Sequence, residues 1–173
     1  MSKDIVIERL TSLETSLEKL ADLLVQVVED GASVGFLPPL SQEEAIEYWK
    51  SVLDPEVMLF AAIVDGHLAA TVQLQLCGKA NGSHRAEIAK LMTHPEYRRR
   101  GIARKLMLTA EAAALEENRS LLVLDTREGD PSNLLYLSLG YQLAGRIPDF
   151  ARSADGSLDA TMIYYKNIGR NGG

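Results

Sequence analysis

One helix of this chain begins within the stretch Thr93-His94-Pro95-Glu96-Tyr97-Arg98-Arg99-Arg100-Gly101-Ile102-Ala103-Arg104. Three consecutive arginines precede a glycine there, although the chain as a whole carries a net charge of −6. Glycine lets the backbone approach an anion closely, and the N–H groups of a helix N-terminus face that anion with the positive end of the helix dipole. The stretch therefore predicts a site for a phosphate-bearing ligand, with an exposed charge run as the alternative.

Length and composition limit the class of protein. The chain has 173 residues, of which 46% are hydrophobic, so we expect one domain over residues 1–173 with a sizeable core. The lone Cys77 cannot form an internal disulfide and the N-terminus has no signal-peptide pattern, which favours the cytoplasm. No apolar run approaches the roughly 20 residues that span a bilayer, so no membrane association is expected. The acidic balance argues against a nucleic-acid partner and leaves room for a cationic substrate.

Hydrophobic patterns and turn signals predict an alternation of strands and helices. Each of the first two helices is expected to begin with a capping box. The first box is Thr11 with Glu14, and the second is Ser41 with Glu44. Asp65-Gly66 is a two-residue hairpin signal, and Asp130-Pro131 is expected to begin a short helix that stops at Gly140. Strands are expected at residues 4–8, 57–64, 71–76, 86–92, 121–124, 141–146 and 161–166, and residues 167–173 as a frayed tail.

The strand at residues 86–92 is irregular. Ile88 and Leu91 lie three positions apart, so a regular pleat would place them on opposite faces. A bulge near Ala89-Lys90 would bring both side chains into the core and would also separate this strand from a neighbour. The apolar run Leu121–Leu124 is typical of a central strand that is buried on both faces, and we expect it to end at Asp125.

The cationic stretch resembles the signature of the GNAT N-acetyltransferase superfamily, Arg/Gln-x-x-Gly-x-Gly/Ala, at residues 98–103. His94-Pro95, the bulged strand, and Asn133, Tyr136 and Gly140-Tyr141 are also similar to that family, and the order of elements resembles it along nearly the whole chain. A closer likeness is to the tabtoxin-resistance acetyltransferases. It lies in Gly31-Ala32-Ser33-Val34-Gly35-Phe36, Gln73-Leu74-Gln75-Leu76-Cys77, Arg85-Ala86-Glu87, Lys90-Leu91-Met92 and Leu124-Asp125-Thr126.

This resemblance implies a mixed α/β GNAT fold. Its central, mostly antiparallel sheet would have six to seven strands, splayed between the fourth and fifth strands, with about four flanking helices. Acetyl-CoA would lie beside the bulged strand as a co-substrate. Backbone groups of Leu91, Met92 and Thr93 would pair with pantetheine and polarise the thioester carbonyl. The pyrophosphate would be held by the backbone N–H groups of Arg99, Arg100, Gly101, Ile102 and Ala103, together with Arg98 and Arg104. Asn133 would hydrogen-bond pantetheine, with a plain surface residue as the alternative.

The resemblance also implies the catalytic residues. Tyr136 would protonate the departing thiolate, because a neutral phenol can donate a proton to a thiolate; its alternative is a packing tyrosine. Glu87 and Asp125 correspond to the acidic pair of the tabtoxin-resistance group. They would bind the acceptor ammonium, accept its proton, or both. Structural alternatives remain open: Glu87 as a solvent-facing residue, and Asp125 as a hydrogen-bond acceptor for the next loop.

Other residues carry weaker signals. Gly31, Ser33 and Phe36 are expected in an acceptor-binding loop, with a simple helix-terminating turn as the alternative. His84 is a further candidate base, but His84 and His67 are expected to be exposed, and His94 structural. Trp49 and Cys77 are interpreted as core residues, and no cluster has metal-ligand spacing.

Together these observations predict a single-domain acetyl-CoA-dependent N-acetyltransferase. It would act on a small-molecule amine, amino-acid-like or toxin- or antibiotic-like, by direct attack in a ternary complex. The alternatives are a non-catalytic acyl-CoA-binding sensor and a peptide or protein N-acetyltransferase. We expect a monomer or a homodimer.

Overall fold

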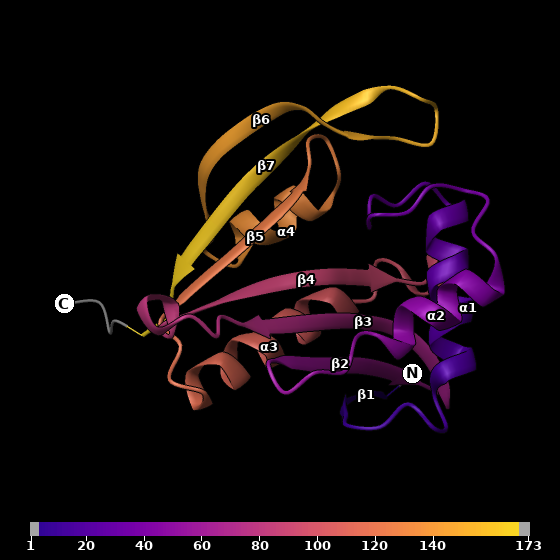
Figure 1. Cartoon of the computed structure of the whole chain (residues 1–173), viewed down its shortest axis with the longest axis horizontal. Helices are drawn as coiled ribbons and strands as arrows, with labels where there is room; N and C mark the ends of the chain where they lie inside the picture. The colour runs from indigo at the N-terminus through magenta and orange to yellow at the C-terminus, as the bar shows by residue number, and fades with distance from the viewer. Residues whose placement is uncertain (1–3, 170–173) are drawn as a thin grey trace.

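The computed structural model describes residues 4–169, which form one seven-stranded mixed sheet with four α-helices (Figure 1). The strand order is β1-β2-β3-β4-β5-β7-β6, which confirms the predicted mixed α/β class. The elements are β1 (Ile5–Leu10), α1 (Leu17–Glu29), α2 (Gln42–Lys50), β2 (Val57–Val64), β3 (His67–Leu76), β4 (Arg85–Thr93), α3 (Ile102–Glu116), β5 (Leu121–Arg127), α4 (Ser132–Ser138), β6 (Gln142–Arg152) and β7 (Leu158–Asn167). Within the described residues, no helix is long and apolar enough to cross a membrane.

Strands β4 and β5 run parallel but pair over only three residues each. Arg85, Ala86 and Glu87 face Leu121, Leu122 and Val123, and the pairing stops there although both strands continue. Figure 1 shows the two strands diverging, so that β5, β6 and β7 form a wing separate from β1–β4. This confirms the predicted splay between the fourth and fifth strands.

The predicted bulge in β4 is present. The register with β3 shifts between Thr71 and Gln73, and Lys90 adopts a φ of 53°. Ile88 is buried in the cluster that α3 covers, and Leu91 packs against the same cluster. An extra residue on one strand lets two side chains three positions apart reach one face, which is the effect that the spacing predicted.

Two hydrophobic clusters lie on opposite faces of the sheet. Met58 and Phe60 of β2 join the cluster beneath α3, whereas Leu59 and Ala61 join the cluster beneath α1 and α2. This alternation is that of a strand buried on both faces. Trp49 is fully buried in the second cluster, as predicted.

Local signals at helix starts and turns had different outcomes. Ser41 and Glu44 form the predicted capping box, and Asp65 and Gly66 both have positive φ, as a tight hairpin turn requires. The box predicted at Thr11 and Glu14 is wrong, because α1 begins at Leu17. The Glu14 N–H is instead bonded to Ser12 Oγ at 3.3 Å, within a separate turn that precedes the helix.

The C-terminal strands are longer than predicted. β5 continues past Asp125 to Arg127, because β7 pairs with it along its whole length. Only Leu122 and Leu124 of β5 are fully buried, so the prediction of burial on both faces is wrong there. The expected tail begins in ordered structure: Asn167 pairs with Leu121, and the Ile168 N–H donates to the Ser120 carbonyl at 2.8 Å. Residues 170–173 of that tail lie outside the described residues.

Candidate functional site

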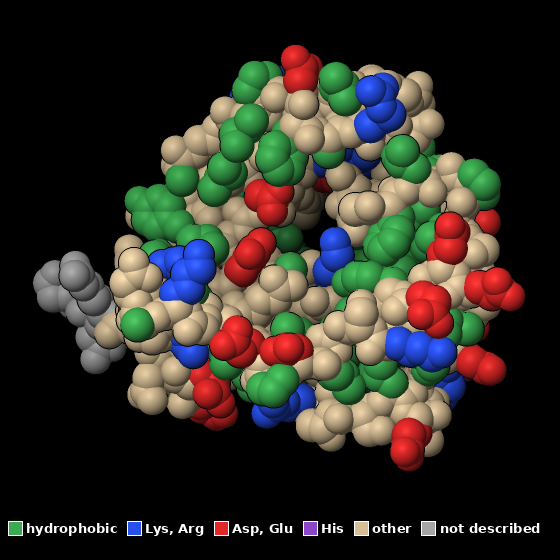
Figure 2. All heavy atoms as spheres, viewed as in Figure 1, with side chains coloured by type: hydrophobic (Ala, Val, Ile, Leu, Met, Phe, Trp, Pro, Cys, Tyr) green, Lys and Arg blue, Asp and Glu red, His purple; other side chains and the backbone are tan. Residues whose placement is uncertain are grey.

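The divergence of β4 and β5 opens a hollow at the middle of the molecule. Figure 2 shows this hollow between the two parts of the sheet, with acidic and basic side chains around its rim. Beyond Glu87, the edge of β4 that faces β5 has no pairing with that strand. Backbone groups at the bulge and at Leu91, Met92 and Thr93 therefore lie along the edge where the predicted pantetheine contacts would form.

The two predicted acids lie on the same face of the sheet. Glu87 is in register with Val123 of the parallel strand, and Asp125 follows Val123 by two residues, so both carboxylates leave the sheet on one side. Burial and the nearby charge of Asp125 raise the pKa of Glu87, while Lys90 lowers it. Asp125 Oδ2 accepts a hydrogen bond from Thr161 Oγ1 at 2.9 Å. The structure thus brings the acidic pair together and fixes one member of it.

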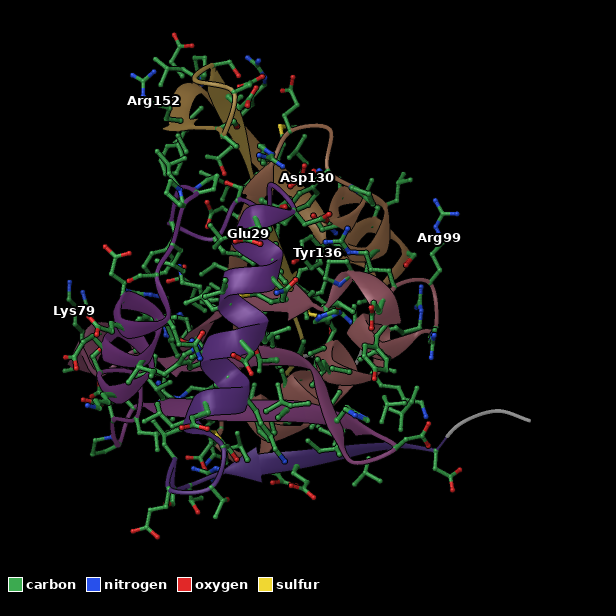
Figure 3. The ribbon with its side chains drawn as sticks, turned by 90° about the vertical axis from the view of Figure 1, so that its right-hand side faces the viewer. Glu29, Lys79, Arg99, Asp130, Tyr136 and Arg152 are labelled. Carbon is green, nitrogen blue, oxygen red and sulfur yellow. The ribbon has the colours of Figure 1, made fainter. Side chains whose placement is uncertain are left out.

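Tyr136 lies in the interior, as Figure 3 shows, and is 5% exposed. Its ring packs on Tyr141 and Tyr164 with centroid separations of 5.9 and 6.0 Å. Burial raises the pKa of Tyr136, and the charges of Asp125 and Asp130 raise it further. The phenol therefore keeps its proton at neutral pH and lies within the electrostatic reach of the acidic pair.

The predicted phosphate site has the backbone geometry of an anion cradle. Gly101 is the N-cap of α3 with a φ of 77°, and Arg99 also has a positive φ of 62°. Gly101 has no side chain to cap the helix, and the first N–H groups of an α-helix have no partner within it. The amides of Ile102, Ala103 and Arg104 are therefore available to an anion.

The arginines around this cradle have different surroundings. Arg98 forms an ion pair with Asp30 at 2.6 Å, and Arg104 donates to Ser138 Oγ at 2.6 Å. The Arg100 guanidinium lies 5.2 Å from the centre of the Tyr97 ring. Arg99 points away from the molecule in Figure 3. The segment thus stays cationic and open to solvent, as a site for a coenzyme phosphate requires.

Asn133 is held within the protein. Its Nδ2 donates to the carbonyls of Arg127 and Asp130 at 2.9 and 2.8 Å, and its Oδ1 accepts from the Tyr164 hydroxyl at 2.8 Å. These bonds connect the start of α4 to β5 and β7. The predicted contact of Asn133 with pantetheine stays a prediction, and the amide has a structural function without it.

The predicted acceptor loop lines a cavity of about 230 Å³. Gly31, Ser33 and Phe36 lie on one wall, and the end of β6 with the start of the turn that follows it forms the other. Phe36 also packs edge-on against Tyr48 of α2, with 5.1 Å between ring centroids. All three residues border this cavity, which adjoins the end of β5, the strand that carries Asp125; their role in binding the acceptor stays a prediction.

Sequence reasoning did not single out two cations near this site. Lys90 Nζ donates to the Val34 carbonyl at 2.8 Å, and burial lowers the pKa of Lys90 against the opposing charges of Asp125 and Glu87. Arg127 follows Asp125 by two residues and borders the cavity. The predicted bulge could have drawn attention to Lys90, which lies in it. Arg127 was missed because β5 was predicted to end at Asp125; in the full-length strand, Arg127 shares a face with Asp125.

The remaining candidates lie elsewhere or have structural contacts. His84 is exposed and precedes β4 at the end where β4 and β5 are still paired. His67 is exposed at the start of β3, and His94 Nδ1 accepts from the Glu96 N–H at 3.1 Å. Cys77 is partly buried. Among residues 4–169, no group of His, Cys, Asp and Glu side chains could hold a metal ion.

Comparison with known proteins gives a consistent result. Residues 21–141 match the family model described as the acetyltransferase (GNAT) family. Three solved structures share the fold over nearly their whole lengths. One is provisionally described as a phosphinothricin N-acetyltransferase, with a TM-score of 0.81, 17% identity, and coverage of 96% of this chain and 100% of that one.

The second is the ribosomal-protein-S18-alanine N-acetyltransferase from Escherichia coli, with a TM-score of 0.74 and 20% identity, covering 98% of this chain and 97% of that one. The third comes from Salmonella typhimurium, is provisionally described as an acetyltransferase, and was solved with its cofactor acetyl-CoA. It has a TM-score of 0.80 and 11% identity, covering 98% of this chain and 97% of that one.

Proposed function

The chain belongs to the acetyltransferase (GNAT) family and is an acetyl-CoA-dependent N-acetyltransferase, and we propose that its acceptor is the amine of a small molecule. The acceptor would be amino-acid-like or toxin- or antibiotic-like, in keeping with the resemblance to the tabtoxin-resistance group. The reaction would proceed by direct attack of the amine within a ternary complex, where holding both substrates together supplies an entropic advantage.

One observation carries the proposal of a small acceptor. The Arg127 guanidinium donates to the Gly31 carbonyl at 3.0 Å and to Ser153 Oγ at 3.2 Å. It therefore bridges the loop after α1 and the turn between β6 and β7, which are the two walls of the acceptor cavity. A bridge across these walls favours a compact acceptor over an extended peptide, since a peptide needs an open groove.

Acetyl-CoA supplies the activated acetyl group when bound. The N–H groups at the start of α3 and the surrounding arginines would hold its diphosphate, and the uncapped N-terminus with Gly101 in a left-handed conformation fits that group. The N–H groups of the β4 edge at Leu91–Thr93 would orient the thioester and polarise its carbonyl.

Glu87 and Asp125 would receive the acceptor as an ammonium ion. The raised pKa of Glu87 brings it closer to neutral pH than an ordinary carboxyl, which favours a general base. One acid would take a proton from the ammonium, directly or through water. The free amine nitrogen then forms its bond to the acetyl carbon as the carbon–sulfur bond breaks, and the nitrogen loses its second proton to water as the amide forms.

Tyr136 would protonate the sulfur that leaves. Its raised pKa keeps the proton in place until the thiolate forms. The same burial also makes a thiolate beside it more basic, which offsets the weaker acidity of the buried phenol.

A thiol-release assay tests the proposal. Purified protein with acetyl-CoA is challenged with amino acids, β-lactam-type amino-acid analogues, polyamines and short peptides with free N-termini. We expect turnover with a small amine and a much lower kcat/KM with every peptide. Turnover confined to peptides would overturn the small-molecule assignment, and binding of acetyl-CoA without turnover of any amine would favour a sensor.

A further inference from the structure

The cavity beside the acidic pair has a cationic lining. Its walls come from the end of α1, the loop that follows, the last residue of β5, the end of β6 and the start of the turn between β6 and β7. Arg127 and Arg152 are its ionisable lining residues, and no Asp or Glu borders it within the described residues. Figure 3 shows Arg152 at the outer end of the β6–β7 wing, above the loop that follows α1.

Both guanidinium groups have donors to spare. Arg127 uses Nε for Asp130 Oδ1 at 3.0 Å and one N–H each for Gly31 and Ser153. A guanidinium has five N–H donors, so two remain for a ligand. Arg152 donates from Nη1 to the Gly156 carbonyl at 2.7 Å and forms no ion pair within residues 4–169. Asp130 is ion-paired with Arg127, the charge of Asp155 also acts on Arg127, and no carboxylate in that range is ion-paired with Arg152. The cavity thus offers N–H donors on both arginines and no carboxylate in its lining.

The cationic cavity and Asp125 are adjacent along one face of β5. Asp125 and Arg127 are two residues apart on β5, so their side chains leave the same face with Cα atoms about 7 Å apart. Thr161 supports this placement, because it is paired with Arg127 across the strands and bonds to Asp125. A carboxylate that receives an ammonium thus stands next to a guanidinium suited to an anion.

We propose that this cavity holds the carboxylate of the acceptor, with Arg127 as the principal contact and Arg152 as a second cation. The inference rests on the N-acetyltransferase function proposed above and narrows its acceptor to an amino acid whose ammonium and carboxylate are separated by a few bonds. Arginine binds a planar carboxylate through paired N–H donors, whereas a monoamine or polyamine brings no anion to accept hydrogen bonds from them.

The test compares matched acceptors in the thiol-release assay. Each amino acid of a panel is paired with its α-carboxamide, which has the same amine and side chain but lacks the anion. We expect the preferred amino acids to exceed their carboxamides in kcat/KM on the order of tenfold or more. Equal turnover of acid and carboxamide, or a preference for polyamines, would overturn this inference while the proposed function stands. Absence of turnover with every amine would overturn both.

Two substitutions test whether Arg127 and Arg152 cause the preference for the amino acid over its carboxamide. Arg127→Lys keeps the charge but loses the fork, and it should reduce the acid-to-carboxamide ratio about tenfold. Arg152→Gln should reduce the ratio severalfold, and it tests the cavity even if changing the Arg127 bridge disturbs folding. Both variants should keep the wild-type Kd for acetyl-CoA.

Arg146→Gln is the matched control. Arg146 is an exposed arginine of the same strand that pairs with Glu128 and does not border the cavity. The acid-to-carboxamide ratio of kcat/KM in this variant should equal that of the wild type. A loss of discrimination in this control as large as in Arg152→Gln would assign the effect to general charge and overturn the site.

Discussion

Thr161 on β7 donates a hydrogen bond to Asp125 on β5, with 2.9 Å between Oγ1 and Oδ2. The same hydroxyl lies 3.2 Å from the Thr126 carbonyl, and Thr161 is almost fully buried. A carboxylate at the edge of an open hollow is thus oriented by a residue that solvent does not reach. This arrangement leaves the second oxygen of Asp125 for the proposed contact with an acceptor ammonium.

Replacing Asp125 by Asn should lower kcat/KM for the acceptor by about a hundredfold, which is the range for loss of a general base or of a charge that binds the ammonium. The Kd for acetyl-CoA should not change, because the proposed coenzyme contacts lie on α3 and β4. Steady-state kinetics and calorimetry measure the two quantities. Thr161→Val is the companion variant: it keeps the carboxylate, loses its orienting bond, and should show a smaller defect. Unchanged kinetics in Asp125→Asn would refute its role.

Replacing Tyr136 by Phe removes only the hydroxyl, since the ring packing on Tyr141 and Tyr164 is retained. We expect kcat to fall by about 10²-fold or more and the Kd for acetyl-CoA to stay within a factor of two or so. A solvent-isotope effect on kcat should also change, because the proton that reaches sulfur then comes from water. Full activity in this variant would leave Tyr136 as a packing residue.

The acid limb of the pH–rate profile should report the deprotonation of the Glu87 carboxyl. Burial and Asp125 raise the pKa of Glu87, and Lys90 lowers it. A base must be deprotonated to act, so activity should rise with pH through a midpoint above the ordinary value for a glutamate.

Two substitutions should move this midpoint in opposite directions. Lys90→Met removes a positive charge and should shift the midpoint to higher pH, whereas Asp125→Asn removes a negative charge and should shift it to lower pH. The position of the limb is the measurement, independent of the absolute rate. A limb that stays in place in both variants would show that Glu87 is not the titrating base.

Local sequence predicted those features whose physical cause is local. The bulge at Lys90 followed from the three-residue spacing of Ile88 and Leu91, and the turn at Asp65-Gly66 followed from residues that tolerate positive φ. The Ser41 capping box formed, whereas the equivalent pattern at Thr11 did not. Two identical signals thus differed in outcome, because the segment before α1 forms a separate turn.

The part of the site that sequence reasoning missed depends on distant pairing. Arg127 acquires its position because β7 extends β5, and one of its acceptors, the Gly31 carbonyl, is 96 positions away. No periodicity within residues 121–127 specifies that contact. The family resemblance indicated Glu87, Asp125 and Tyr136, and the structure brings these three into one electrostatic neighbourhood. Their catalytic roles stay predictions.

The proposed coenzyme cradle at the start of α3 should be sensitive to a single methyl group at Gly101. A Cβ there meets nothing within 4 Å, so an alanine does not clash, but the φ of 77° strains any residue other than glycine. A left-handed conformation costs an L-residue about 1–2 kcal/mol, so Gly101→Ala should lower the free energy of unfolding by that amount or relax the loop. Relaxation would turn the first amides of α3 away from the diphosphate and raise the Kd for acetyl-CoA.

Gly145→Ala is the matched control for this last prediction. A Cβ at Gly145 also meets nothing within 4 Å, the φ of this residue is not in the left-handed range, and it lies on β6. Chemical denaturation and calorimetry on both variants separate backbone strain from the mere addition of a methyl group. We expect weakened acetyl-CoA binding or reduced stability in Gly101→Ala alone. Equal behaviour of the two variants would mean that the conformation of Gly101 does not shape the phosphate cradle, and the arginine side chains would then have to hold the diphosphate without it.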